Sequence, residues 1–178
     1  PSPITIYVDQ NSIETIKIGT EAHPFTTIGG AIELAGPNDN IQVGGGIYNE
    51  NLLAKIPVNL IGSGADSTII DGNDADLPVL SFVNVSGGSI SGFTLRNGYQ
   101  SGIRCSNSII NIYNNRIRDT RPYYSIEGDG ITAQSGSTLK IYNNIIINNS
   151  IIGVYIDTSS NAEVINNTIS DNRWFGVA

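Results

Sequence analysis

The chain has 178 residues, with nine Lys and Arg against 16 Asp and Glu, which gives a formal charge of −7. Such an acidic chain lacks the basic stripe that nucleic-acid binding requires, so we predict no nucleic-acid partner. No apolar segment has the length of a membrane span, and we predict none. A single cysteine excludes an intramolecular disulfide and a metal cluster built from cysteines.

The composition favours strands and turns over helices. The sequence contains 30 Ile, 21 Asn and 20 Gly, and only 14% of its residues are charged. Branched Ile suits a pleated surface, whereas Asn and Gly are typical of turns. We therefore expect many short strands separated by frequent corners.

The first distinctive element in chain order is an amphipathic helix over residues 24–36. Gly36-Pro37 predicts where it ends. Gly29 and Gly30 lower its intrinsic propensity, so packing must stabilise it. Apolar residues recur at intervals of three and four on one face of this helix, namely Phe25, Ile28, Ala31, Ile32 and Ala35.

An acidic segment follows at 71–76. Asp71, Asp74 and Asp76 place three carboxylates within six residues, and carboxylate oxygens are the ligands that Ca²⁺ prefers. The order of residues lacks the EF-hand pattern, which favours a polar loop between strands. We predict no firm metal site and no cofactor, with Ca²⁺ at these three residues as the alternative.

The second half of the chain contains an internal repeat. Three segments align without gaps, 110–117, 139–146 and 162–169, and a weaker copy covers 88–95. Their last residues are 22, 29 and 23 positions apart, so a period of about 22–23 is interrupted by one insertion. Within each copy apolar residues alternate at period two, which indicates short strands with one buried face. A repeat of this length and pattern predicts a solenoid.

Asparagine pairs occupy the same two positions in the three gapless copies. Asn114, Asn143 and Asn166 share the first position, and the following residue is also Asn in each copy. Asn tolerates a left-handed backbone, and its amide both donates and accepts hydrogen bonds. We predict that each pair turns a corner and that the amides form a ladder between successive coils.

Two solenoids fit this spacing. The segment 110–117 also matches the core of a leucine-rich repeat, which has a similar period. Leucine is scarce here, however, and the other half of each unit reads as a strand that begins with Gly, as in 130–134 and 153–157. We predict an all-β parallel solenoid with about 22–23 residues per coil, and keep the leucine-rich-repeat-like solenoid as the alternative.

At this point the chain resembles the right-handed parallel β-helix proteins of the pectate-lyase-like superfamily. The resemblance rests on the Gly-Ile/Val and Ile-x-Asn-Asn-x-Ile repeats and on the amino-terminal segments 6–9, 24–28, 40–43 and 46–50. It implies one β-helix domain over residues 1–178, with helix 24–36 closing the first coil. Many unrelated activities share this fold.

The insertion, which we place at 118–129, carries the candidate chemistry. Polysaccharide lyases of similar fold use Ca²⁺ held by acidic side chains and an Arg or Lys that abstracts a sugar proton. In the repeat register Thr94, Arg116 and Ile145 form one outward column, and Arg96, Arg118 and Ile147 form the next, so three arginines share one face. Around the insertion the catalytic candidates are Arg116, Arg118, Asp119 and Asp129, and the substrate-binding candidates are Arg96, Arg104, Tyr123 and Tyr124. The alternative is that these arginines pair with nearby carboxylates, Glu127 included, on a solvated face.

The last residues, 174–178, begin another coil at Gly176. An open coil exposes strand edges and apolar columns. We expect either that the chain is a fragment of a longer β-helix or that this coil mediates self-association.

Two classes of function remain. The first is a non-catalytic extracellular or cell-surface scaffold of structural or adhesin type that binds a polysaccharide or another glycan, or self-assembles. The second is a lyase or glycoside hydrolase that acts on an acidic polysaccharide at the arginine-rich face.

Overall fold

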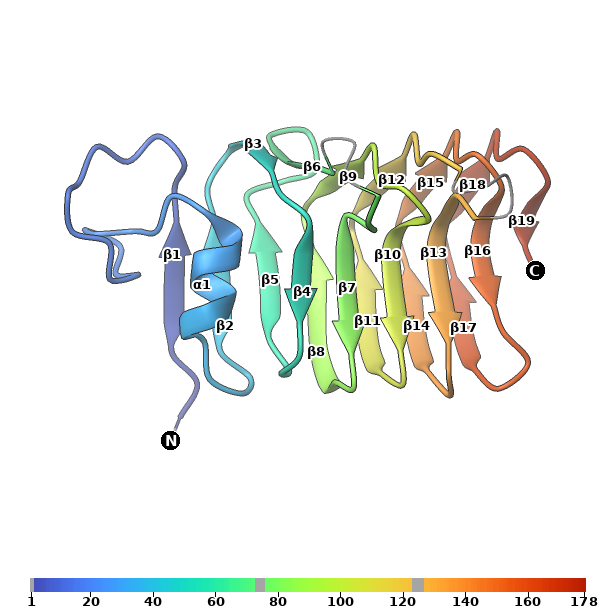
Figure 1. Cartoon of the computed structure of the whole chain (residues 1–178), viewed down its shortest axis with the longest axis horizontal. Coiled ribbons are helices and arrows are strands. Elements are labelled where there is room, and N and C mark those ends of the chain that lie inside the picture. The colour runs from blue at the N-terminus through green and yellow to red at the C-terminus, as the bar shows by residue number, and fades with distance from the viewer. Residues whose placement is uncertain (1, 73–75, 123–126) are drawn as a thin grey trace.

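The computed structural model describes residues 2–72, 76–122 and 127–178 and shows a solenoid of three parallel sheets, A, B and C (Figure 1). From residue 40 onward, each turn of the backbone adds one strand to each sheet in the order A, B, C. The pairs of strands in all three sheets are parallel, so the predicted parallel β-helix is confirmed. The leucine-rich-repeat alternative is wrong, because the second half of each coil is a strand.

The strands are short, as the frequent Asn and Gly predict. Sheet A consists of β1 (Thr5–Val8), β2 (Asn40–Val43), β5 (Asn59–Gly62), β8 (Ser86–Ser91), β11 (Ile109–Tyr113), β14 (Thr138–Tyr142) and β17 (Asn161–Ile165). Sheet B consists of β3 (Gly46–Asn49), β6 (Thr68–Asp71), β9 (Thr94–Arg96), β12 (Arg116–Arg118), β15 (Ile145–Ile147) and β18 (Thr168–Ser170). Sheet C consists of β4 (Leu52–Ala54), β7 (Leu80–Val83), β10 (Ser101–Ser106), β13 (Asp129–Gln134), β16 (Ile152–Ile156) and β19 (Phe175–Val177).

The helix is shorter than the predicted 24–36. Helix α1 (Ile28–Leu34) begins after Thr27, whose extended backbone and side chain cap its first turn. Phe25 lies before the helix because it forms a parallel bridge with Val8. Glu50 accepts hydrogen bonds of 2.8 Å from the first two amides of the helix, and the buried face of α1 joins the core beside β1, β2 and β4 (Figure 1). Among the described residues no helix is long and apolar enough to cross a membrane.

The core is a stack of equivalent side chains. In sheet A, Ile90, Ile112 and Ile141 are in register and fully buried. In sheet C the same relation joins Phe82, Cys105 and Ala133, and burial raises the pKa of the Cys105 thiol. Each coil therefore covers the apolar face of the preceding coil, which a single coil cannot bury alone.

The asparagine ladder, formed by Asn115, Asn144 and Asn167, lines the corner between sheets A and B. The backbone amide of Asn115 donates to Oδ1 of Asn144 over 3.0 Å, and that of Asn144 donates to Oδ1 of Asn167 over 2.9 Å. Nδ2 of Asn144 donates to the carbonyl oxygen of Ile112 as well. Asn114, before the ladder, has a φ of 55°, and its equivalents in the next two coils also have positive φ. The predicted ladder and corners are confirmed.

The other two corners have ladders of their own. Between sheets C and A, the backbone amide of Ser108 donates to Oγ of Ser137, and that of Ser137 donates to Oγ of Ser160. Between sheets B and C, the backbone amide of Asn149 donates to Oδ1 of Asn172. These ladders satisfy backbone amides that turn away from the sheets, as buried polar groups require.

Candidate functional site

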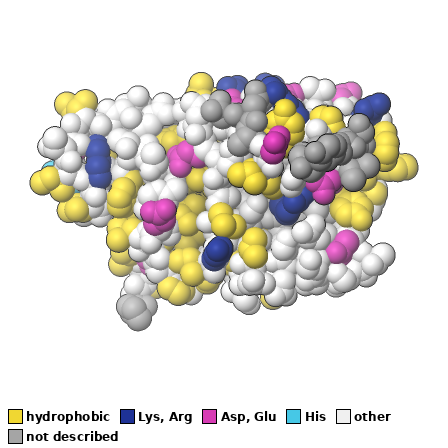
Figure 2. Space-filling model, in the orientation of Figure 1, with side chains coloured by type: hydrophobic (Ala, Val, Ile, Leu, Met, Phe, Trp, Pro, Cys, Tyr) yellow, Lys and Arg dark blue, Asp and Glu magenta, His cyan; other side chains and the backbone are white. Residues whose placement is uncertain are grey.

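The outer face of sheet B carries Arg96, Arg116 and Arg118, which we call the arginine face. Arg118 lies in register with Arg96 on one side and Ile147 on the other, whereas Arg116 lies between Thr94 and Ile145. The predicted columns are therefore confirmed. Figure 2 shows Lys and Arg side chains gathered along the upper edge of the molecule, where Figure 1 places sheet B.

Each arginine of this face has a carboxylate partner. Arg96 Nε lies 2.7 Å from Asp71 Oδ2, and Arg118 Nε lies 2.8 Å from Asp119 Oδ2. Arg116 Nη1 lies 2.8 Å from an oxygen of Asp66, a residue that the sequence did not single out. Pairing of this kind favours the solvated alternative, because the guanidinium charges are balanced locally. A catalytic role for Arg116, Arg118 and Asp119 stays a prediction.

Arg104 and Asp129 lie on a different face, sheet C, so the predicted cluster divides into two groups. Arg104 is on β10 and lies in register with Thr132 on β13, which in turn lies in register with Tyr155 on β16. Glu127, in the connection before β13, approaches Arg104 Nη2 to 3.4 Å. Tyr123 and Tyr124 lie outside the described residues, as does Asp74.

A groove of about 320 Å³ follows the outer face of sheet C, and we call it the sheet C groove. Figure 2 shows basic, acidic and hydrophobic side chains close together on this face, toward the carboxy-terminal end. The groove combines charged, amide, hydroxyl and aromatic side chains, contributed by Arg104, Glu127, Asp129, Thr132, Gln134, Ile151, Ile152, Tyr155 and Trp174.

Asp129 is the buried acid of this groove. Only 6% of the residue is exposed. Its Oδ1 accepts a hydrogen bond of 3.1 Å from the backbone amide of Ile152, and its Oδ2 accepts one of 3.2 Å from the hydroxyl of Thr132. Burial is the largest effect and raises the pKa of Asp129 to about 6, although the two hydrogen bonds and Arg104 oppose it. The carboxyl group therefore gains and loses a proton at mildly acidic pH.

Arg104 is held at the other side of the groove. Its Nη1 donates to Oε1 of Gln100 over 2.5 Å. Its Nε is buried and has no hydrogen-bond partner among the described residues. A planar guanidinium fixed by neighbouring side chains presents its donors in a constant direction. This arrangement suits recognition of oxygen atoms on a ligand.

Tyr155 and Trp174 supply aromatic surface to the groove, with 38% and 57% of each residue exposed. Neither residue was identified from the sequence as part of a site. For Tyr155 the signal was the sheet C column itself, in which Ser81, Arg104, Thr132 and Tyr155 follow one another without repetition. A column that changes residue type in every coil is not explained by stacking of equivalent side chains.

Two of the three aspartates of the acidic segment, Asp71 and Asp76, lie among the described residues. Asp71 Oδ2 is engaged by Arg96, and Nδ2 of Asn97 donates to Asp71 Oδ1 over 2.9 Å. Asp76 is exposed. No group of three or more His, Cys, Asp or Glu is arranged to hold a metal ion within residues 2–72, 76–122 and 127–178. Ca²⁺ at Asp71, Asp74 and Asp76 stays a prediction.

Comparison with known proteins places this geometry in a family. The family model described as "Right handed beta helix region" matches residues 58–178. The structure is similar to a crystal structure of alginate lyase from Paenibacillus sp. str. FPU-7, with a TM-score of 0.60 and 18% identity. That match covers 74% of this chain and 47% of the lyase, so the chain corresponds to about half of the lyase's length. No curated protein sequence matches the chain. The chain belongs to the right-handed β-helix family, with a pectate-lyase-like fold.

Proposed function

We propose that this chain is an extracellular or cell-surface β-solenoid that binds a carbohydrate chain in the sheet C groove without cleaving it. The observation that carries the proposal is the presence of two exposed aromatic rings and a fixed arginine in one groove. Aromatic faces pack against the apolar C–H face of a sugar, and charged side chains form strong hydrogen bonds with its hydroxyl groups. Tyr155, Trp174 and Arg104 would have these roles.

The length of the groove supports a polymer rather than a single small molecule. Its lining residues come from four successive strands or connections of sheet C, from Arg104 on β10 to Trp174 before β19. Successive coils are separated by the spacing of paired strands, about 4.8 Å, which is close to the length of one sugar unit. A chain of sugars lying along the solenoid axis would contact equivalent positions of several coils.

An enzyme is the second candidate, and a specific observation favours it. Glycoside hydrolases use two carboxyl groups that flank the bond to be cleaved. Glu127 and Asp129 line the same groove, and the raised pKa of Asp129 suits a proton donor at mildly acidic pH. In such a reaction Asp129 would give its proton to the glycosidic oxygen as the C–O bond breaks. Glu127 would take a proton from the water that adds to the sugar carbon.

The test of binding uses the single tryptophan of the chain as a reporter. A glucose hexamer with β-1,4 linkages and a uronate hexamer, titrated separately, should change the fluorescence of Trp174 and give a saturable curve. Tyr155→Ala should weaken binding at least tenfold, because it removes one aromatic contact. Arg116→Ala, on the arginine face, is the matched control and should bind as the unmodified chain does. Absence of saturation with both hexamers would contradict the proposal.

The same oligosaccharides separate binding from catalysis. We expect unchanged hexamers after prolonged incubation at about pH 5, where Asp129, with its pKa raised to about 6, is mostly protonated. New reducing ends that disappear in Asp129→Asn would establish the hydrolase. Products with unsaturated ends from the uronate hexamer would establish a lyase instead. Either product would replace the non-catalytic proposal with the second candidate.

We also propose self-association through the last coil. Strands β17, β18 and β19 are the terminal strands of their sheets. They expose strand edges together with Phe175 and Val177, each about half exposed. Unpaired edges beside apolar side chains favour pairing with another chain. Sedimentation should show a dimer that dissociates when Phe175 and Val177 are both changed to Lys, and a monomer at every concentration would refute the interface.

A further inference from the structure

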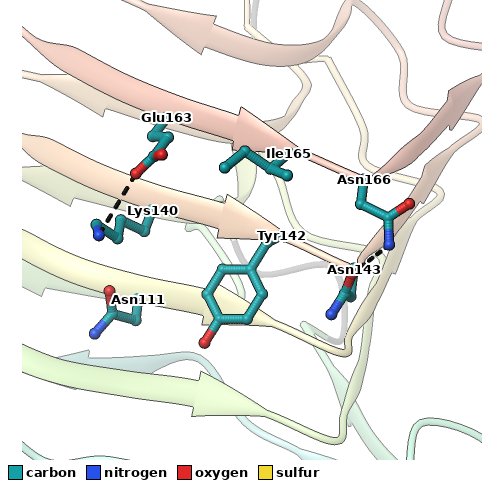
Figure 3. Close-up of a pocket in the computed structure, with 7 residues that line it drawn as sticks. All are labelled: Asn111, Lys140, Tyr142, Asn143, Glu163, Ile165 and Asn166. Atoms are coloured by element: carbon teal, nitrogen blue, oxygen red, sulfur yellow. Dashed lines mark hydrogen bonds and ion pairs between the residues drawn. The ribbon is translucent and has the colours of Figure 1, made fainter.

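A hollow of about 530 Å³ lies on the outer face of sheet A, on a different sheet from the sheet C groove. We call it the tyrosine hollow. It extends over three neighbouring strands, with Asn111 on β11, Lys140 and Tyr142 on β14, and Glu163 and Ile165 on β17 (Figure 3). None of these residues has a role in the sheet C groove.

One wall of the hollow is the end of an aromatic stack. The rings of Tyr113 and Tyr142 are nearly parallel, at 2°, and their centroids are 5.0 Å apart. The two residues are in register on adjacent strands, and the next residue of the column is Ile165. Because the column continues with Ile165, one face of Tyr142 is covered by Tyr113 and no aromatic ring of the next coil covers the other. The isoleucine is shorter than a tyrosine and half exposed, so the third position of the stack is left open above it.

The polar groups beside this open position have no net charge. Lys140 Nζ lies 3.5 Å from Glu163 Oε2, and both side chains are more than half exposed. At the corner, Nδ2 of Asn166 donates to Oδ1 of Asn143 over 2.6 Å (Figure 3). An ammonium, a carboxylate and amides together offer both donors and acceptors. Such a set matches a neutral ligand with several hydroxyl groups better than an ion.

We propose that the tyrosine hollow binds a neutral pyranose ring, stacked on the open face of Tyr142 above Ile165. The C–H face of the sugar takes the place of the missing third ring of the stack. Its hydroxyl groups donate to Glu163 and accept from Lys140, so the ion pair orients the ring. A planar aromatic compound would use the face of Tyr142 but leave the ion pair without a hydrogen-bonding role.

The decisive variant fills the open position. Ile165→Tyr continues the stack onto β17 and occupies the place of the sugar, and it is tolerated because this side chain is already half exposed. We expect the glucose hexamer to perturb the Tyr142 ring resonances in proton–carbon NMR spectra of the unmodified chain, and to lose this effect in Ile165→Tyr. Tyr142→Ala, followed at the ring resonances of Tyr113, should weaken binding at this site at least tenfold. Glu163→Gln, which keeps the shape but removes the carboxylate, should weaken it severalfold.

Controls separate this site from the sheet C groove. Tyr155→Ala should leave the effect at Tyr142 intact, and Ile165→Tyr should leave the fluorescence response of Trp174 intact. Each proposal can therefore fail without the other. The proposal for the tyrosine hollow is overturned if the hexamer perturbs the Tyr142 resonances in Ile165→Tyr as strongly as in the unmodified chain. It is also overturned if p-nitrophenol, a planar aromatic probe, binds at Tyr142 whereas the hexamer does not.

Discussion

Polar side chains are buried in both the asparagine ladder and the sheet C groove, but they are held by different partners. Asn144 is bonded by the equivalent asparagines of the coils on either side, so one residue type satisfies itself along the column. Asp129 lies between Ser101 and Ile152 in its column and is bonded by a threonine hydroxyl and a backbone amide. The amide is neutral at every pH, whereas the carboxyl group titrates near pH 6.

The difference indicates how structural and functional columns can be told apart in a solenoid. A uniform column stabilises the stack, and its substitution affects every coil that depends on it. A mixed column gains nothing from stacking of like on like, so its residues are free to serve a local purpose. The following predictions test this distinction, beginning with the largest effect on the free energy of unfolding.

Replacing Asn144 with Ala should destabilise the protein by about 3 kcal/mol, because buried backbone groups of Asn115 and Ile112 lose their partners. Asn143→Gly is the matched control at the same corner. Asn143 is exposed and has a positive φ that Gly adopts freely, so its replacement should cost less than about 0.5 kcal/mol. Urea unfolding measures both values. Equal costs for the two variants would show that the ladder does not stabilise the stack.

Gly130→Ala should cost about 2 kcal/mol, because adjacent coils approach too closely for a side chain. A Cβ atom at Gly130 would lie 2.6 Å from the carbonyl oxygen of Gly153 and 2.6 Å from Cγ2 of Ile146. Gly136 is the control, since a Cβ atom there meets nothing within 4 Å. Its positive φ alone should cost about 1 kcal/mol on substitution by Ala. A larger loss of stability for Gly136→Ala than for Gly130→Ala in thermal unfolding would contradict this explanation.

Asp129→Asn should stabilise the protein by about 1–2 kcal/mol above pH 6. The pKa of this carboxyl group is raised in the folded state, so the folded chain binds more protons than the unfolded chain between roughly pH 4 and pH 6. Its contribution to stability is therefore present at lower pH and is lost as the pH rises through about 6. Unfolding at about pH 4 and about pH 8 should reveal this dependence in the unmodified chain and its reduction in the variant. An unchanged pH dependence in the variant would assign the titration to another group.

Arg116→Ala should have the smallest effect on unfolding, less than about 1 kcal/mol, because its partner Asp66 is 90% exposed. The pair is weakened by salt as well, so the difference should shrink when the ionic strength is raised. A loss above about 2 kcal/mol would mean that the arginine face is a structural column after all.

Much of the fold could be predicted from the sequence, because a solenoid repeats its local rules. The positions of Ile112 and Ile141 follow from their phase in the repeat, and the asparagine ladder follows from the same phase. The start of the helix was harder to predict, because it depends on the bridge between Phe25 and Val8, two residues far apart in the chain. The arginine columns were predicted correctly, but Asp71 and Asp66, the carboxylate partners of Arg96 and Arg116, come from an earlier coil without the clear repeat.

The candidate sites were only partly predictable. Arg104 and Asp129 were identified by their type and by their place near the insertion, yet their separation from the arginine face depends on the corner between sheets B and C. Tyr155 and Trp174 join them because β16 and β19 follow β13 in sheet C. Nothing in the local sequence around Trp174 indicates that this residue lines the same groove as Arg104 and Asp129.

The sequence by itself determined the period, the inward columns and the corners, because each of these depends on residues within one coil and its copy in the next. Apart from the arginine columns, only the tertiary structure decided which outward side chains share a face. Sheet membership is set by the number of corners between two residues, and the burial that raises the pKa of Asp129 arises from groups brought together by separate coils. Local patterns specify how the backbone winds, whereas the contents of a groove depend on how the windings are placed beside one another.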